Sequence, residues 1–228
     1  MRIELPSGTP AELVRPAGAE PSAGLVIAPD IMGLRPLFDD MAARLAEEQG
    51  WAVIAVEPFP GRETMTLEAR MAAMATLDDE RQVGDLAAAA DALGVETVGL
   101  IGFCMGGMYA LKAAVTGRFD RVAAFYGMIR VPAAWQGAGQ GQPLELFAAA
   151  PSRATRVLAI IGTADPYTPP EDVDALVAAG ATVVRYEGAE HGFVHDPSRP
   201  AHRADDAADA WSRVLAWLRD SNVSGSEG

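Results

Sequence analysis

The chain has one cysteine, an excess of negative charge and few cationic side chains. Because Cys104 is the only cysteine among 228 residues, no internal disulfide can form. Eighteen Lys and Arg residues stand against 31 Asp and Glu residues, which gives a formal net charge of -13. Such a charge repels nucleic acid and anionic lipid headgroups. We therefore expect neither a nucleic-acid partner nor a membrane surface as a partner.

Long apolar runs are absent as well. Segments such as 24–28 and 98–102 are far shorter than the roughly 20 apolar residues that span a bilayer. The first residues, Met-Arg-Ile-Glu-Leu-Pro, contain no apolar h-region and no small-residue cleavage site. Together with the single cysteine, these features favour a cytoplasmic location. A monomer and a small homo-oligomer both remain open.

What the sequence does contain is an alternation of apolar and amphipathic segments. Half of the residues are hydrophobic, which suffices at this length for one large core. Strand-like apolar runs occupy 25–28, 51–56, 95–101, 122–125, 157–161 and 182–186. Helical patterns occupy 36–49, 67–93, 105–116, 170–178 and 203–219, the second of which is long enough for two helices. This alternation predicts an α/β fold with a mostly parallel sheet and helices on both faces.

We expect one domain over residues 1–220 and a flexible tail over 221–228. The glycine-rich segment 136–143 resembles a flexible loop inside that domain rather than a boundary. In the last helix, apolar residues recur at helical spacing and are expected to pack on the sheet. These residues are Ala207, Trp211, Val214, Leu215 and Leu218.

The segment Gly102-Phe-Cys-Met-Gly follows a strand-like run and opens a helical one. It fits the G-x-nucleophile-x-G elbow, with cysteine in place of the usual serine. A sharp strand-to-helix turn requires small neighbours, which Gly102 and Gly106 supply. The following helix directs its N-terminal N–H groups at Cys104, which favours the thiolate. The alternative is a small buried cysteine on a turn that the glycines merely shape.

Two later loops supply partners for a nucleophile. Asp165 follows the strand-like run 157–161, and His191 follows the run 182–186. The order nucleophile, acid, histidine is that of α/β-hydrolases, and all three residues follow strands whose ends meet at one edge of the sheet. Alone, Asp165 could cap a loop and His191 could be a surface histidine. His195 and His202 follow no strand so closely and rank below His191.

Five motifs resemble the dienelactone hydrolase family, and the resemblance covers about residues 1–220. They are Pro29-Asp-Ile-Met-Gly, Gly102-Phe-Cys-Met-Gly-Gly, Phe125-Tyr-Gly, Gly162-Thr-Ala-Asp and Gly188-Ala-Glu-His-Gly-Phe. The resemblance implies an α/β-hydrolase fold and a triad of Cys104, Asp165 and His191. It also implies that the N–H groups of Ile31 and Met105 form an oxyanion hole and that Tyr126 lines the site. For Met105 the elbow geometry gives the same answer, because the amide after the nucleophile is the usual donor.

The chain departs from the family pattern at two places. Where well-known members carry a glutamate that partners the resting thiol, this chain has Asp30, which is either a shorter thiol or pocket partner or a turn residue. An arginine that binds the substrate carboxylate soon after the catalytic histidine is missing, because Val194 and His195 stand there. Arg35, Arg62 and Arg81 are candidate replacements, although solvated charges are the commoner role of arginines.

These features predict a hydrolase that cleaves small lactones or carboxylic esters through an acyl-enzyme on Cys104. No cofactor is expected, because the glycines at 102–107 match neither a phosphate-binding loop nor a dinucleotide fingerprint. No metal is expected either, because metal-ligand spacings are lacking. The alternative function is a non-catalytic small-molecule-binding or thiol-redox-sensing protein on the same fold.

Overall fold

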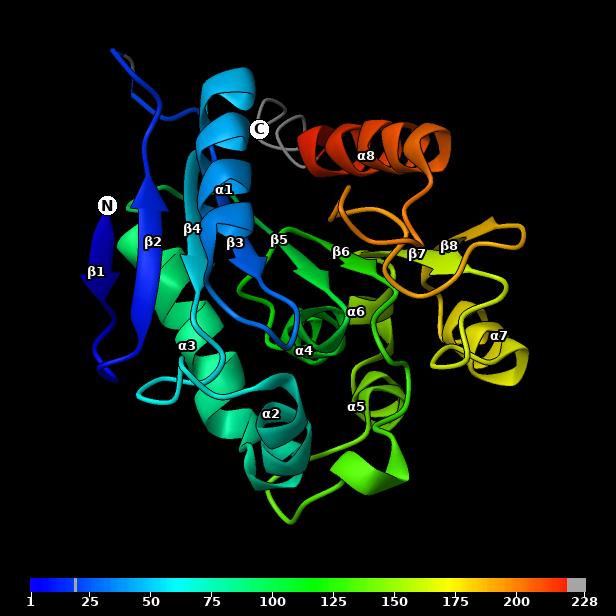
Figure 1. The fold of residues 1–228 in the computed structure, drawn as a ribbon. Coiled ribbons are helices and arrows are strands. Elements are labelled where there is room, and N and C mark those ends of the chain that lie inside the picture. Colours follow the sequence, from blue (N-terminus) through cyan, green and yellow to red (C-terminus); the bar gives the residue numbers. More distant parts are fainter. Residues whose placement is uncertain (19, 221–228) are drawn as a thin grey trace.

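The computed structural model of the protein describes residues 1–18 and 20–220. Its strands are β1 (Arg2–Glu4), β2 (Pro10–Val14), β3 (Gly24–Ala28), β4 (Ala52–Val56), β5 (Val98–Phe103), β6 (Arg121–Phe125), β7 (Val157–Gly162) and β8 (Thr182–Tyr186). They form one sheet in the order β1-β2-β4-β3-β5-β6-β7-β8 (Figure 1). The pairs β1–β2 and β2–β4 are antiparallel, and all the others are parallel.

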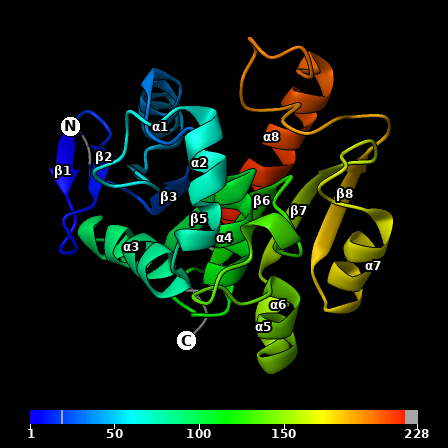
Figure 2. The same ribbon diagram turned by 60° about the horizontal axis from the view of Figure 1, so that its bottom comes forward.

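Helices cover both faces of the sheet. They are α1 (Pro36–Gln49), α2 (Leu67–Ala73), η1 (Met74–Thr76), α3 (Asp79–Ala92), α4 (Met105–Ala114), η2 (Ala133–Trp135), α5 (Pro143–Ala149), α6 (Pro151–Ala154), α7 (Pro170–Ala178) and α8 (Ala204–Arg219). Helices α1 and α8 pack on one face, whereas α3, α4 and α5 pack on the other, as Figure 2 shows from below. Because both faces are covered, the central strands are apolar throughout and fully buried. The predicted fold class is confirmed.

The amphipathic pattern of α8 is borne out by its packing. Ala207, Val214 and Leu218 are buried, and Trp211 and Leu215 pack partly buried against the same apolar cluster. Within the described residues, no helix is long and apolar enough to cross a membrane.

Two parts of the chain differ from the sequence-based expectation. The first two strands, β1 and β2, were not predicted, because they are short, lie at the sheet's edge and are only partly buried. The long helical pattern forms two helices, as its length allowed, and α3 begins where Asp78 accepts hydrogen bonds from the N–H groups of Glu80 and Arg81. The glycine-rich segment 136–143 is held in place by Gln140, whose amide donates to the carbonyl of Met74 at 2.6 Å. The predicted tail, 221–228, lies outside the described residues.

The parallel strands β3 to β8 all end at the same edge of the sheet. The loops that leave β3, β5, β6, β7 and β8 at this edge carry the residues that the sequence singled out. In open α/β sheets this edge is where ligands bind. The fold therefore brings these loops to one place, although Asp30 and His195, on the first and last of them, are 165 residues apart.

Candidate active site

Cys104 occupies a strained turn between β5 and α4. Its backbone angles are φ 56° and ψ -119°, a conformation that non-glycine residues rarely adopt, and its N–H donates to the carbonyl of Phe125 at 3.0 Å. A Cβ at Gly102 would lie 2.1 Å from the carbonyl oxygen of Gly106. A Cβ at Gly106 would lie 2.1 Å from the carbonyl oxygen of Ala28. The two glycines therefore serve the steric purpose that the sequence predicted.

Asp165 and His191 form a pair beside this turn. The Nδ1 atom of His191 lies 2.8 Å from Oδ2 of Asp165, whose side chain is fully buried. The other carboxylate oxygen of Asp165 accepts a hydrogen bond from the N–H of Tyr167 at 2.8 Å. These contacts fix the carboxylate, which in turn fixes the orientation of the imidazole ring.

The electrostatic surroundings of His191 favour its protonated form. Burial opposes a positive charge, but interactions with Asp165 and with Cys104 outweigh it and raise the pKa of His191 to about 9. A protonated imidazole stabilises a negative charge on the neighbouring sulfur. The geometry thus joins a carboxylate, an imidazole and a sulfur in series.

The cysteine and the histidine open into a cavity of about 440 Å³. Its wall is largely apolar, with residues from α2, η2 and the loop after β6, and it also contains a few charged side chains. The apolar residues are Ile31, Met32, Leu67, Met71, Met128, Trp135 and Tyr167, and the charged ones are Asp30, Arg35, Asp196 and Arg199. A mostly apolar wall with a few convergent polar groups is typical of a small-molecule site.

Two backbone amides near the sulfur are available to a ligand. In the part of the chain that the structure describes, the N–H groups of Ile31 and Met105 have no hydrogen-bond partner. Met105 is the first residue of α4 and directly follows Cys104, and Ile31 lines the cavity in the loop between β3 and α1. Free N–H groups in this position can hold a negatively charged oxygen.

Asp30 is held by residues other than the thiol. Its carboxylate accepts hydrogen bonds from both terminal nitrogens of Arg35 at 2.7 and 2.8 Å, from the N–H of Met32 at 2.9 Å, and pairs with Nε2 of His195 at 2.8 Å. Burial opposes its charge, yet the bonds from His195 and Arg35 hold the pKa of Asp30 well below its usual range. Asp30 thus lines the cavity, and its carboxylate is engaged by Arg35, Met32 and His195.

Tyr126 lies behind the imidazole of His191 and is not part of the cavity wall. The residue is fully buried, and its ring centroid is 5.2 Å from that of His191 in an edge-on arrangement. Its hydroxyl is bonded to Nδ1 of His195. Tyr126 therefore contacts the histidine, and not the space that a substrate would occupy.

Comparisons with known proteins identify the family of the chain. The model of the Dienelactone hydrolase family matches residues 9–221. The chain belongs to the dienelactone hydrolase family. Its relatives include a probable 2-oxo-3-(5-oxofuran-2-ylidene)propanoate lactonase of Bradyrhizobium sp, which is 27% identical over 229 residues. The match covers 92% of this chain and 88% of the lactonase. The carboxymethylenebutenolidase of Rhodococcus opacus is 30% identical over 213 residues, covering 85% of this chain and 79% of its own.

Solved structures share this fold. The crystal structure of a candidate dienelactone hydrolase from Klebsiella pneumoniae superposes with a TM-score of 0.81 at 24% identity, covering 96% of this chain and 97% of the other. The predicted family and the predicted class, a dienelactone hydrolase-like lactone or ester hydrolase, are confirmed.

Some residues at the site of this chain were not singled out by the sequence. Arg199 lines the cavity and, among the described residues, forms no ion pair, whereas Arg35 is engaged by Asp30. Arg62 and Arg81 lie outside the cavity. Because Arg199 follows the histidine by eight residues in an irregular loop, no spacing rule pointed to it.

The aromatic part of the cavity wall was also missed. Trp135 and Tyr167 stack with ring centroids 6.3 Å apart, although 32 residues separate them in the sequence. As for metals, no group of three or more His, Cys, Asp or Glu side chains within the described residues could hold one.

Proposed function

We propose that the protein hydrolyses small lactones or carboxylic esters through a triad of Cys104, His191 and Asp165. The observation that carries this proposal is the pair of His191 and Asp165 at 2.8 Å, beside a cysteine on a strained elbow that opens into the same cavity. This arrangement supports the assignment of Cys104 as nucleophile, His191 as base and Asp165 as the orienting carboxylate.

In the first half of the reaction, the sulfur of Cys104 attacks the carbonyl carbon and the carbonyl electrons move to the oxygen. The N–H groups of Ile31 and Met105 are suited to bind that oxyanion. When the carbonyl reforms, the carbon–oxygen bond to the leaving group breaks, and His191 gives the leaving oxygen its proton. With a lactone, the alcohol so formed stays attached to the acyl group.

In the second half, His191 changes its role. Part of the rise in the pKa of His191 comes from interaction with Cys104, and a sulfur in a thioester carries no negative charge. The pKa of His191 therefore falls in the acyl-enzyme, so that the ring can take a proton from water. The resulting hydroxide attacks the thioester, and the released sulfur recovers its charge as His191 holds the proton.

The cavity suggests what else the substrate carries. Its apolar lining, with Met71, Met128 and Trp135, suits a hydrocarbon portion, and Arg199, which forms no ion pair within the described part of the chain, can receive a carboxylate. An Arg199→Gln variant should show a raised KM for an anionic lactone and an unchanged KM for a neutral ester. Arg62→Gln is the matched control, because Arg62 lies outside the cavity.

The test of the function is hydrolysis of a panel that contains dienelactone and p-nitrophenyl acetate. We expect turnover by the wild-type protein and its loss in Cys104→Ala and His191→Ala, with His202→Ala as the control for removal of a histidine. Full activity in Cys104→Ala would refute the proposed nucleophile. No turnover on any member, with Cys104 still reactive towards alkylating agents, would favour the binding or thiol-sensing alternative.

A further inference from the structure

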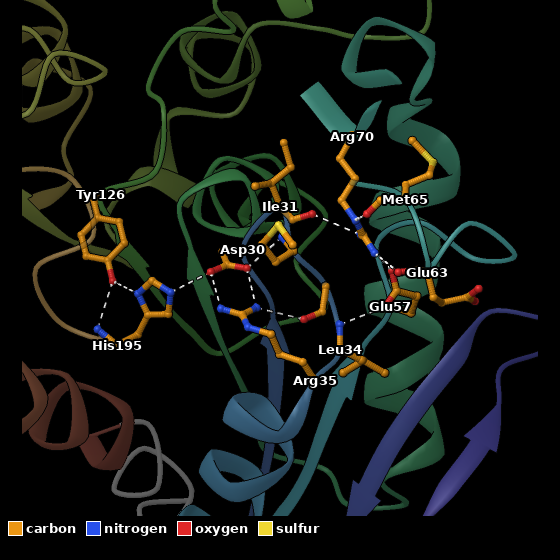
Figure 3. A network of polar contacts seen from close by, with 12 residues as sticks. Asp30, Ile31, Leu34, Arg35, Glu57, Glu63, Met65, Arg70, Tyr126 and His195 are labelled. Carbon is orange, nitrogen blue, oxygen red and sulfur yellow. Dashed lines mark hydrogen bonds and ion pairs between the residues drawn. The ribbon is translucent and has the colours of Figure 1, made fainter. Parts of the chain in front are cut away.

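A second histidine lies buried behind the proposed triad. The side chain of His195 is fully buried, and its ring packs against those of Phe38 and Phe103, with centroids 5.9 and 5.0 Å away. Figure 3 shows its two nitrogens directed to opposite sides, one to Asp30 and the other to Tyr126. One side chain thus bridges the loop after β3 and the loop after β6.

The protons of this bridge can be assigned from its partners. Asp30 is ionised and can only accept, so Nε2 of His195 donates to it. Burial lowers the pKa of His195 despite the attraction of Asp30, so the ring is neutral. Its Nδ1 therefore accepts from the hydroxyl of Tyr126, whose oxygen accepts in turn from the backbone N–H of His195 at 3.3 Å. Every polar atom of the ring has a partner.

On one side of the bridge, Asp30 fixes the backbone of its own loop. Its carboxylate accepts from the N–H of Met32 at 2.9 Å, and its carbonyl accepts from the N–H of Gly33 at 2.9 Å. Arg35 binds both carboxylate oxygens and balances their charge. The loop therefore folds around a single carboxylate.

A second buried ion pair holds the same loop from the side of α2. Glu57 accepts from the N–H of Leu34 at 2.9 Å, and Arg70 donates to the carbonyl of Ile31 at 3.2 Å. Arg70 and Glu57 lie 3.6 Å apart, and each side chain is at most 2% exposed. Figure 3 shows the two sets of contacts on either side of Ile31. In this loop, the N–H groups of Met32, Gly33 and Leu34 are all bonded, and that of Ile31 is left free.

We propose that His195 is a positioning residue of the reaction, which through Asp30 holds the Ile31 N–H where the oxyanion forms and through Tyr126 supports the ring of His191. The inference rests on the proposed function, because it assigns the Ile31 amide to the oxyanion. It differs from a thiol role for Asp30, because the carboxylate is engaged by Arg35 and His195. Preorganised donors accelerate acyl transfer only when they are held in place.

Two substitutions break the bridge at different ends. His195→Asn places an amide near the position of Nδ1, so the bond to Tyr126 is kept and the bond to Asp30 is lost. His195→Gln reaches the position of Nε2, so an N–H can still donate to Asp30. The matched control is His202→Asn, because Nδ1 of His202 has no hydrogen-bond partner among the described residues.

Two reactions of the same cysteine provide the readout. Acylation by p-nitrophenyl acetate, followed as the burst of p-nitrophenolate, passes through an oxyanion, whereas alkylation by iodoacetamide does not. For His195→Asn we expect the acylation rate constant to fall by about tenfold or more, less than the roughly 10²-fold or larger loss on removing a donor outright. Alkylation and the KM for the ester should change little. His195→Gln should retain acylation within about threefold, because its hydrogen bond to Asp30 is kept.

Equal losses in acylation and alkylation would overturn the proposal, because they would indicate a general structural role. Unchanged acylation in His195→Asn would also overturn it, as would a matching loss in His202→Asn. A wild-type protein that is alkylated at Cys104 but never acylated would refute the proposed function itself, and the inference would fall with it. The failures can therefore be told apart.

Discussion

Replacing Gly106 by alanine tests the elbow and the loop that it touches. A Cβ at this position would lie 2.1 Å from the carbonyl oxygen of Ala28 and 2.3 Å from that of Pro29, whereas real Cβ atoms essentially never approach within 3.0 Å. Both neighbours are backbone atoms, so no change of rotamer can relieve the clash. The start of α4 must move away from the end of β3 by about 1 Å.

The magnitude follows from this displacement. Overpacking of a filled core costs about 1–3 kcal/mol. In a chain of this size each kcal/mol lowers the melting temperature by about 2–4 °C. Pro29 precedes Asp30 and Ile31 directly, so the same shift moves the Ile31 amide. A misplacement of about 1 Å can reduce turnover by about 10²-fold. We therefore expect Gly106→Ala to lose stability and kcat together.

Gly84→Ala is the matched control for this experiment. Gly84 lies within α3, and a Cβ there would meet nothing within 4 Å. Alanine in a helix is more stable than glycine by about 0.5–1 kcal/mol, so this variant should melt higher and keep full activity. Thermal melting and p-nitrophenyl acetate hydrolysis would be measured for both. A Gly106→Ala protein that melts like the wild type and retains its kcat would refute the reasoning.

Three further predictions concern charged groups. Asp165→Asn should lower kcat by about 10²–10⁴-fold in steady-state assays while leaving KM similar, because the imidazole loses the partner that fixes its tautomer; a loss below threefold would contradict this role. Because the pKa of His191 is raised to about 9 and the proposed acylation uses the proton of His191, the acylation burst should decline as the pH rises through about 9. A decline already centred near pH 6.5 would contradict the role of His191 as proton donor. Lys112→Met should reduce the free energy of unfolding in urea by about 1.5 kcal/mol, since Asp79, which is partly exposed, loses its charged partner at 2.6 Å; unchanged stability would show that the pair contributes nothing.

The sequence predicted those parts of the fold whose causes are local. The central strands are continuous apolar runs because both faces of a parallel sheet are covered, and the elbow is marked by glycines because backbone atoms pass close to them. The cavity wall was not predictable in this way. Trp135 and Tyr167 meet only because η2 and the loop after β7 are brought together by the fold, and neither segment has a periodic pattern.

The two histidine–carboxylate pairs show where sequence reasoning stops. His191 with Asp165 and His195 with Asp30 are chemically the same pair, each with a contact of 2.8 Å. Their surroundings give opposite results, because the pKa of His191 is raised whereas burial lowers that of His195.

The difference arises from burial and from what else touches each pair. At His191, interactions with Asp165 and Cys104 outweigh burial and favour a second proton on the ring. At His195, burial outweighs the attraction of Asp30, and the positive charges of Arg199 and Arg35 lower the pKa further. Asp30 and His195 are 165 residues apart, so no local pattern could pair them. The pair of His191 and Asp165 is thereby suited to move a proton. The pair of His195 and Asp30, with a neutral imidazole and a carboxylate that is fully hydrogen-bonded, is suited to fix the position of a loop.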